Sequence, residues 1–303
     1  MAEALFFSTS AGAYLADDIL TKIPTLNTGK CRQGHFVDGE VMFYLDEPVK
    51  GRACVILGHT GPPAENLLEM FTIINTLKIN GAKKIISVIP YFGYARSDRD
   101  KPLQPINSRL FAGFLKQAGV SRVVCLDLHS RLNAKYISVP LTHLSALPLM
   151  ADYYANQKIG NLAIATPDHG GIDRANLFAK QMGINKIVVI EKYRPTDTTA
   201  ISLNITGEVN NKNVIVVDDM IETGHTLLSA AKLLKAKGAK NLYAAVTHCI
   251  YQSKGINLLS STSLYKKILI SNSQEPKTKL PPKVSIINIV PLLSKAIAKE
   301  IVG

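Results

Sequence analysis

Residues 214–228, VIVVDDMIETGHTLL, constrain the fold of this chain more than any other segment. Four β-branched residues in a row, Val214 to Val217, suit a strand buried on both faces of a sheet, and an amphipathic helix follows a short loop. Gly224 in that loop can take a positive φ, and the hydroxyls of Thr223 and Thr226 lie beside the unpaired N–H groups that begin the helix. The segment predicts a strand, loop and helix that bind an anion.

Two acidic residues, Asp218 and Asp219, stand between the expected strand and the loop. Ionised carboxylates only accept hydrogen bonds, so they would repel a phosphate but bind the vicinal hydroxyls of a sugar that carries one. The loop is expected to run from Glu222 to Thr226. Taken alone, paired aspartates at a strand end or a T-G-x-T turn could be structural. The whole pattern predicts a site for a phosphorylated ribose.

The rest of the chain alternates strand-like and helix-like segments, which is typical of parallel sheets covered on both faces. The expected strands are residues 52–57, 84–89, 122–126, 162–165, 187–190, 214–217 and 242–246. LKINGAKKI at 77–85 resembles LKAKGAKNL at 234–242, about half the chain away. The repeat predicts a duplicated α/β domain with the join near residue 145, although both segments could also be generic helix-to-strand units.

Composition argues against several classes of partner. The 303 residues have room for two domains, and no segment approaches the run of about 18 apolar residues that a membrane span needs. The formal charge of +12 is scattered without an aromatic-basic motif, so neither a membrane nor a nucleic acid is expected as a partner.

The N-terminus does not look like a signal peptide and the four cysteines are far apart, which predicts a cytoplasmic location. P-loop and protein-kinase motifs do not occur.

Six further segments carry a resemblance to a known family. They are FVDGE at 36–40, GPPAENLLEM at 61–70, PYFGYARSDR at 90–99, the DLH ending at His129, TPDHGG at 166–171 and EKYRP at 191–195. Together with residues 214–228 they resemble the ribose-phosphate pyrophosphokinases, from about Phe6 to Ile301. The resemblance implies an α/β protein of two tandem phosphoribosyltransferase-like domains, each a mainly parallel sheet flanked by helices.

The same resemblance implies a division of labour along the chain. Residues 1–145 would form the N-terminal domain with the ATP side and the oligomer contacts. Residues 146–290 would form the C-terminal domain with the ribose 5-phosphate site, and residues 291–303 a helix that returns to the first domain. The implied reaction transfers the diphosphoryl group of ATP to the C1 hydroxyl of ribose 5-phosphate and releases AMP. Two alternatives are a non-catalytic regulatory homologue that binds sugar phosphate and a phosphoribosyltransferase.

The resemblance also assigns roles to residues. Lys192 and Arg194, on one side of an extended segment, are the expected catalytic pair. The implied ribose 5-phosphate site comprises Asp218, Asp219, Glu222, Thr223, Gly224, His225 and Thr226. The implied ATP site comprises Phe36, Asp38, Glu40, Arg96, Ser97, Asp98 and Arg99. FVDGE would reach across from a neighbouring subunit, so a homo-oligomer, a dimer or larger, is expected.

Magnesium is the expected cofactor because it accompanies ATP, with His129 and Asp168 as its contacts in the family pattern. Histidine is an unusual partner for this hard cation, so a contact through water or phosphate is equally plausible for His129.

The chain departs from the family pattern at four positions. Ser97 replaces a glutamine, Tyr193 an arginine, Glu222 an aspartate and His225 a glycine. If the backbone at position 225 has a positive φ, the histidine would add strain of about 1 kcal/mol.

Overall fold

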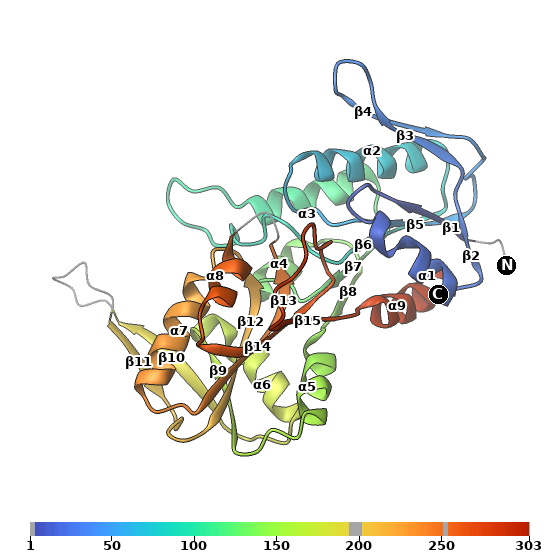
Figure 1. The fold of residues 1–303 in the computed structure, drawn as a ribbon. Coiled ribbons are helices and arrows are strands. Elements are labelled where there is room, and N and C mark those ends of the chain that lie inside the picture. Colours follow the sequence, from blue (N-terminus) through green and yellow to red (C-terminus); the bar gives the residue numbers. More distant parts are fainter. Residues whose placement is uncertain (1–3, 194–201, 251–253, 303) are drawn as a thin grey trace. The chain divides into compact units, whose positions relative to one another are not determined.

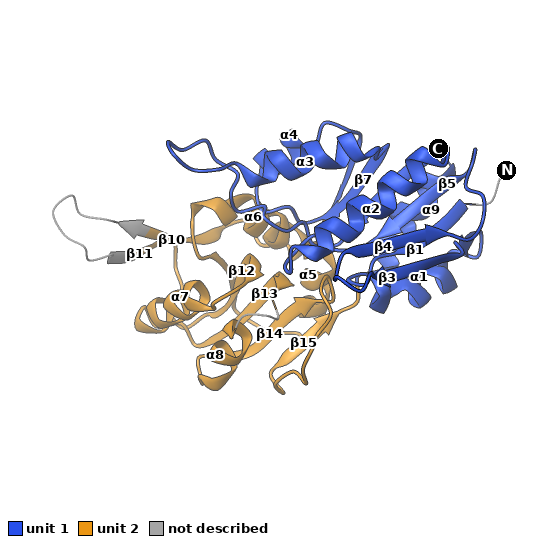
Figure 2. Cartoon of the chain, turned by 90° about the horizontal axis from the view of Figure 1, so that it is seen from above, with its two compact units in different colours: residues 1–144, 289–303 blue, residues 145–288 orange. Residues whose placement is uncertain are grey.

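The computed structural model describes residues 4–193, 202–250 and 254–302. The chain forms two compact units, Met1–Leu144 with Ile289–Gly303, and Ser145–Asn288 (Figure 2). Each unit contains a mainly parallel sheet flanked by helices (Figure 1). The α/β fold class expected from the sequence is therefore confirmed.

Unit 1 contains a sheet in the order β2-β1-β5-β6-β7-β8, and all of its strand pairs are parallel. Its strands are β1 (Ala4–Ser8), β2 (Leu26–Thr28), β5 (Ala53–Leu57), β6 (Lys84–Ile89), β7 (Arg122–Leu126) and β8 (Leu141–Leu144). A separate antiparallel hairpin joins β3 (Cys31–His35) to β4 (Val41–Leu45). The helices are η1 (Ala13–Leu15), α1 (Ala16–Lys22), α2 (Glu65–Ile79), α3 (Asn107–Ala118), α4 (Arg131–Tyr136) and α9 (Val290–Val302).

Unit 2 contains a sheet in the order β11-β10-β9-β12-β13-β14-β15, in which only the β10–β11 pair is antiparallel. Its strands are β9 (Leu162–Thr166), β10 (Ile187–Tyr193), β11 (Ser202–Thr206), β12 (Asn213–Ile221), β13 (Asn241–Cys249), β14 (Tyr265–Ser271) and β15 (Val284–Ile287). The helices are α5 (Leu147–Asn156), η2 (His169–Gly171), α6 (Ile172–Gln181), α7 (His225–Ala236) and α8 (Gly255–Ser261). In the described part of the chain no helix is long and apolar enough to cross a membrane.

The core of unit 2 follows the hydrophobic pattern of residues 214–228. Val214 to Val217 are fully buried, as expected for a central strand of a parallel sheet. In α7 the residues Leu227, Ala230, Ala231 and Leu234 are at most 2% exposed. They have the i, i+3, i+4, i+7 spacing of a helix face that packs on a sheet.

Strand β12 is longer than the sequence predicted. It continues through Asp218 and Asp219 to Ile221, because β13 pairs with it along its whole length, up to Ile221 opposite Cys249. The expectation that the two acids end the strand is therefore wrong. The acids remain at the carboxyl end of the sheet, where parallel strands present their ligand-binding groups.

The two units share a strand order. In unit 1 the first strand, β1, lies between β2 and β5, and in unit 2 β9 lies between β10 and β12. When the first residues of β6 and β13 are aligned, Ala53, which pairs with Lys84, corresponds to Asn213, which pairs with Asn241. Position 58 then corresponds to 218 and position 59 to 219. Unit 1 therefore has glycine and histidine where unit 2 has the acid pair, so the acid-pair signature occurs once per chain.

Helix α9 is fixed to unit 1 by Glu300, which is 8% exposed. Its carboxylate accepts hydrogen bonds from Thr142 Oγ1 at 2.6 Å and from Arg122 Nε at 2.7 Å, and its backbone carbonyl accepts one from Lys84 Nζ at 2.6 Å. These three partners belong to β8, β7 and β6, in that order. The C-terminal helix is therefore attached to three adjacent strands that are distant in sequence.

We expect Glu300→Ala to lower the free energy of unfolding by about 2 kcal/mol, because it leaves Thr142 and the partly exposed Arg122 without their shared acceptor. Lys299→Ala, one position away on an exposed side chain, is the matched control and should change it by less than about 0.5 kcal/mol. Urea unfolding measures both variants. Equal effects of the two substitutions would show that the Glu300 contacts do not hold the helix.

Candidate active site

Asp218 and Asp219 at the end of β12 share one arginine. They are 9% and 3% exposed. Arg174 of α6 places Nη2 at 3.1 Å from Asp219 Oδ1 and at 3.7 Å from Asp218 Oδ1. Asp218 Oδ1 also accepts the backbone N–H of Asp219 at 2.9 Å. The acid pair is thus held by one guanidinium from a neighbouring helix.

Burial makes the charge on this pair costly. Desolvation on burial is the largest cause that raises the pKa of Asp218 well above its usual value, and the adjacent charge of Asp219 is the next. The charge of Arg174 lowers this pKa. Two carboxylates and one guanidinium leave one negative charge in excess when both acids are ionised. Such a site is suited to accept hydrogen bonds from neutral donors such as sugar hydroxyls.

The loop after β12 is shorter than predicted and consists of Glu222 to Gly224, since His225 and Thr226 belong to the first turn of α7. Gly224 has φ 77°, as the sequence led us to expect. A Cβ at this position would lie 2.8 Å from the carbonyl oxygen of Gly255, the first residue of α8. Gly255, which the sequence reasoning missed, lets α8 approach the loop closely. His225 is not among the positive-φ residues, so the strain considered for it does not arise.

The side chains around the helix start face solvent. Thr223, His225 and Thr226 are exposed, Glu222 is half-buried, and the N-cap residue of α7 is Gly224, which has no side chain to cap the first turn. The first N–H groups of a helix have no partner within the helix and carry partial positive charge. The loop therefore combines helix N–H groups with two threonine hydroxyls, which is the donor set that a phosphate requires.

Asp168 follows β9, the strand beside β12, and shapes a compact turn. Its Oδ1 accepts the N–H of Gly171 at 3.2 Å, and its carbonyl accepts the hydroxyl of Thr166 at 3.0 Å. Arg174 lies on the next helical turn of the same segment. The sequence reasoning missed Arg174, although an arginine beside the apolar face of a helix that covers a sheet is a usable signal.

The predicted catalytic pair is described only in part. The backbone of Lys192 lies in β10, opposite Leu203 of β11, so the extended conformation expected for it is present. Thr206 Oγ1 donates to Glu191 Oε1 at 2.7 Å and ties the two strands together next to Lys192. Arg194 lies outside the described residues.

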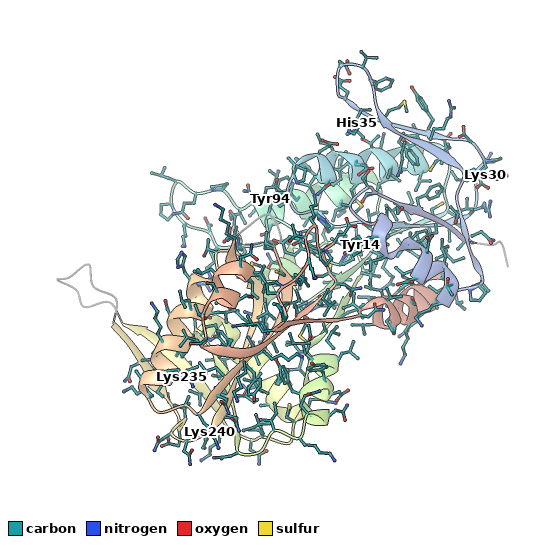
Figure 3. The ribbon with its side chains drawn as sticks, in the orientation of Figure 1. Tyr14, Lys30, His35, Tyr94, Lys235 and Lys240 are labelled. Carbon is teal, nitrogen blue, oxygen red and sulfur yellow. The ribbon has the colours of Figure 1, made fainter. Side chains whose placement is uncertain are left out.

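Phe36, Asp38 and Glu40, expected on the ATP side, form the tip of the β3–β4 hairpin. The N–H of Phe36 donates to the carbonyl of Glu40 at 2.9 Å, and Asp38 Oδ1 accepts the N–H of Glu40 at 3.1 Å. The ring of Phe36 is 46% exposed and meets Tyr44 edge to face. At the base of the tip lies His35, which is labelled in Figure 3. Its Nε2 pairs with Glu65 Oε1 at the start of α2. The tip thus presents an exposed aromatic ring.

Arg96, Ser97, Asp98 and Arg99 lie in the loop between β6 and α3. Arg96 and Arg99 are exposed, whereas Asp98 is 4% exposed. The hydroxyl of Ser97 donates to the carbonyl of Pro105 and so closes the loop on itself. Tyr94, at the start of this loop, lies apart from His35 of the hairpin (Figure 3). The two expected parts of the ATP site are therefore not brought together within unit 1.

His129 follows β7 and is half-buried. The backbone N–H of Leu128, the residue before His129, donates a hydrogen bond to Nε2 of His143 at 3.0 Å. Nε2 of His143 is therefore an acceptor. Burial is the main cause that lowers the pKa of His143, so the ring stays neutral and keeps this role. His143, to which the sequence analysis gave no role, fixes the turn that carries His129.

Comparison with known proteins identifies the family. The family model for the N-terminal domain of ribose phosphate pyrophosphokinase matches residues 4–119, and the phosphoribosyl transferase domain matches residues 147–272. The ribose-phosphate pyrophosphokinase of Thermosipho africanus is 38% identical over 98% of this chain and 94% of its own length. The chain belongs to the ribose-phosphate pyrophosphokinase family. The family suggested by the sequence segments is thus confirmed.

Other relatives agree. The ribose-phosphate pyrophosphokinase of Bacillus subtilis is 33% identical over 97% of this chain and 92% of its own length. The crystal structure of phosphoribosylpyrophosphate synthetase from Mycobacterium smegmatis matches with a TM-score of 0.88 and 29% identity, and covers 97% of both chains. The ribose-phosphate pyrophosphokinase architecture therefore extends over both units.

The side chains available for magnesium are few. Each unit offers one expected contact, Asp168 in unit 2 and His129 in unit 1, and one oxygen of Asp168 already accepts a backbone N–H. Within the described residues, no three histidine, cysteine or acidic side chains gather as a metal cluster. Because magnesium keeps water and binds nucleotide phosphates, this donor set fits a magnesium ion carried mainly by ATP.

The close approach at Gly224 leads to a testable difference. Gly224→Ala should lower the free energy of unfolding by about 2–4 kcal/mol, from the positive φ and from the contact with Gly255. Gly183→Ala is the matched control, because Gly183 has φ 69° but no atom within 4 Å of its added Cβ. Gly183→Ala should lower the free energy of unfolding by only about 1 kcal/mol. Urea unfolding distinguishes the two, and equal losses would exclude a role for the Gly255 contact.

The raised pKa of Asp218 predicts a pH-dependent cost of this site. Above the unfolded-state pKa of about 3.9, the unfolded chain releases this proton readily whereas burial opposes its release in the folded protein, so Asp218 lowers the stability of the fold as the pH rises. Asp218→Asn, which can still accept the Asp219 N–H, should therefore stabilise the ligand-free protein by about 1 kcal/mol at pH 7. The gain should shrink as the pH falls towards 4. Thermal unfolding at several pH values measures it, with the exposed Glu275→Gln as control, and a destabilised variant at pH 7 would contradict the prediction.

Proposed function

We propose that this chain transfers the diphosphoryl group of ATP to the C1 hydroxyl of ribose 5-phosphate, giving 5-phosphoribosyl 1-pyrophosphate and AMP. The observation that carries the proposal is the acid pair at the end of β12, followed by the start of α7 at the glycine N-cap Gly224, in a chain of this family. The two groups match the diol and the phosphate of one sugar phosphate.

Within unit 2 the roles follow from charge and exposure. The acid pair Asp218–Asp219 supplies the acceptor group for the ring hydroxyls, and Asp218 is the more exposed of the two. Thr223, Gly224 and Thr226 provide hydroxyl and N–H donors for the 5-phosphate, and Glu222 and His225 border this cradle. Burial of the acids fixes them before the substrate arrives, which lowers the reorganisation needed on binding.

The reaction needs cations because negative charge grows on the transferred group and on the leaving AMP. We assign this role to Lys192, near the end of β10, and to Arg194, two positions further along the chain. Magnesium bound to ATP would neutralise phosphate charge, and we assign as its contacts Asp168 and, directly or through water, His129. The side chains of this chain supply the positioning of both substrates.

For ATP, we assign Phe36 to stacking on the adenine, and Asp38 and Glu40 to polar contacts with the nucleotide. Arg96 and Arg99 are exposed and suited to phosphates, while Ser97 and Asp98 support their loop. Because the hairpin tip and this loop lie apart in unit 1, the proposed ATP site combines the tip of one subunit with the loop of another. The active form is then a homo-oligomer, and we place it in the cytoplasm.

One assay tests the proposal. Purified full-length chain with ribose 5-phosphate and Mg-ATP should form AMP. Lys192→Ala should lower kcat by about 100-fold or more, because it removes a cation from the transition state. Lys186→Ala, an exposed lysine just before β10, is the matched control and should keep the rate.

Two results would redirect the proposal. If AMP does not form while ribose 5-phosphate still binds, the chain is a regulatory homologue. If pyrophosphate is released from added phosphoribosyl pyrophosphate only when a nucleobase is present, the chain is a phosphoribosyltransferase.

A further inference from the structure

We propose that Arg174 is a positioning residue for ribose 5-phosphate, which holds Asp219 in place and thereby leaves Asp218 as the carboxylate that receives the sugar hydroxyls. The inference rests on the proposed function and refines its substrate site. It assigns different tasks to two adjacent acids that the sequence alone treats as equivalent.

The first argument is geometric. Arg174 Nη2 lies 3.1 Å from Asp219 Oδ1, within hydrogen-bond distance, but 3.7 Å from Asp218 Oδ1. The side chain of Asp219 is 4% exposed and that of Asp218 is 13% exposed. The guanidinium therefore engages the inner acid, and the outer acid keeps its access to a ligand.

The second argument concerns how Arg174 reaches the strand end. Helix α6 packs against both β9 and β12, and the arginine side chain, 16% exposed, extends from it beside the turn of Asp168. A Cβ on Gly171 in that turn would lie 2.1 Å from Thr166 Oγ1 and 3.9 Å from Arg174 Nη2. A glycine at this point keeps the turn compact beside the guanidinium. The same short segment thus carries Asp168 and directs Arg174 to the acid pair.

The third argument is electrostatic. Two adjacent carboxylates that are nearly buried cannot both stay ionised at low cost unless a cation compensates them. Arg174 supplies that charge from a fixed helix. Without it the acids would share a proton or move apart, and in either case the acceptor geometry for a diol would be lost. Removal of Arg174 should therefore weaken sugar binding without any contact between Arg174 and the sugar.

The test compares Arg174→Met, Asp219→Asn and the double variant in the full-length protein. Each single variant should raise the KM for ribose 5-phosphate about 10- to 100-fold, because a hydrogen bond between charged groups is lost. The KM for ATP should change by less than about twofold. Arg174→Met and Asp219→Asn break the same contact, so the KM of the double variant for ribose 5-phosphate should be no higher than that of the weaker-binding single variant.

Arg174→Lys keeps the charge and should raise this KM less than Arg174→Met does. Lys180→Met, an exposed lysine of the same helix, should bind like the wild type.

Calorimetric titration with ribose 5-phosphate measures the dissociation constant of each variant without turnover, so it separates this inference from the proposed reaction. A wild type that binds the sugar phosphate but forms no AMP would refute the reaction only. Unchanged affinity in Arg174→Met, or effects of Arg174→Met and Asp219→Asn that multiply in the double variant, would overturn the positioning role. A wild type that does not bind ribose 5-phosphate would overturn both. If Arg174→Met does not fold, the affinities of Arg174→Lys and Asp219→Asn decide the question.

Discussion

The proposed sugar site depends on keeping two adjacent carboxylates at the end of a buried strand. Asp218 and Asp219 are tolerated there because Arg174 supplies a positive charge from α6 and because the backbone N–H of Asp219 satisfies one acid oxygen. Strand β12 lies between β9, which pairs with it up to Val216, and β13, whose pairing continues past the acids to Ile221 and holds them in place. The loop to which we assign the phosphate can follow the strand at once, because Gly224 and Gly255 allow the backbones of the loop and α8 to meet. Each neighbouring element thus supports the acid pair.

The two units show how one strand order can serve two purposes. Unit 1 repeats the order around its first strand but has Gly58 and His59 at the positions of the acids. Its candidate functional residues are instead on additions to the sheet, namely the β3–β4 hairpin and the loop before α3. Fold and site are therefore separable, as is general for architectures of this kind. We infer that the duplicated scaffold provides the sugar phosphate site in one copy and nucleotide contacts in the other.

The acid pair also illustrates the conflict between stability and ligand binding. Burial raises the pKa of Asp218, so the ligand-free protein bears a cost that a neutral side chain would avoid. The cost is consistent with a site prepared for a ligand, because a bound sugar would bring hydroxyl donors to acids that are already held in place. Asp168 and His143 show the same preorganisation on a smaller scale, because each fixes a turn through a backbone N–H.

The sequence by itself determined the α/β class, the central strand of unit 2, the positive φ of Gly224 and the family, because these follow from local patterns of hydrophobicity, backbone freedom and residue order. It did not determine that β12 runs through the acids, since that depends on pairing with β13. It also missed Arg174 and Gly255, which meet the acid pair and the loop only after α6 and α8 have packed. The tertiary structure decided these contacts because each joins residues that are distant along the chain, and no local pattern specifies which of them will meet.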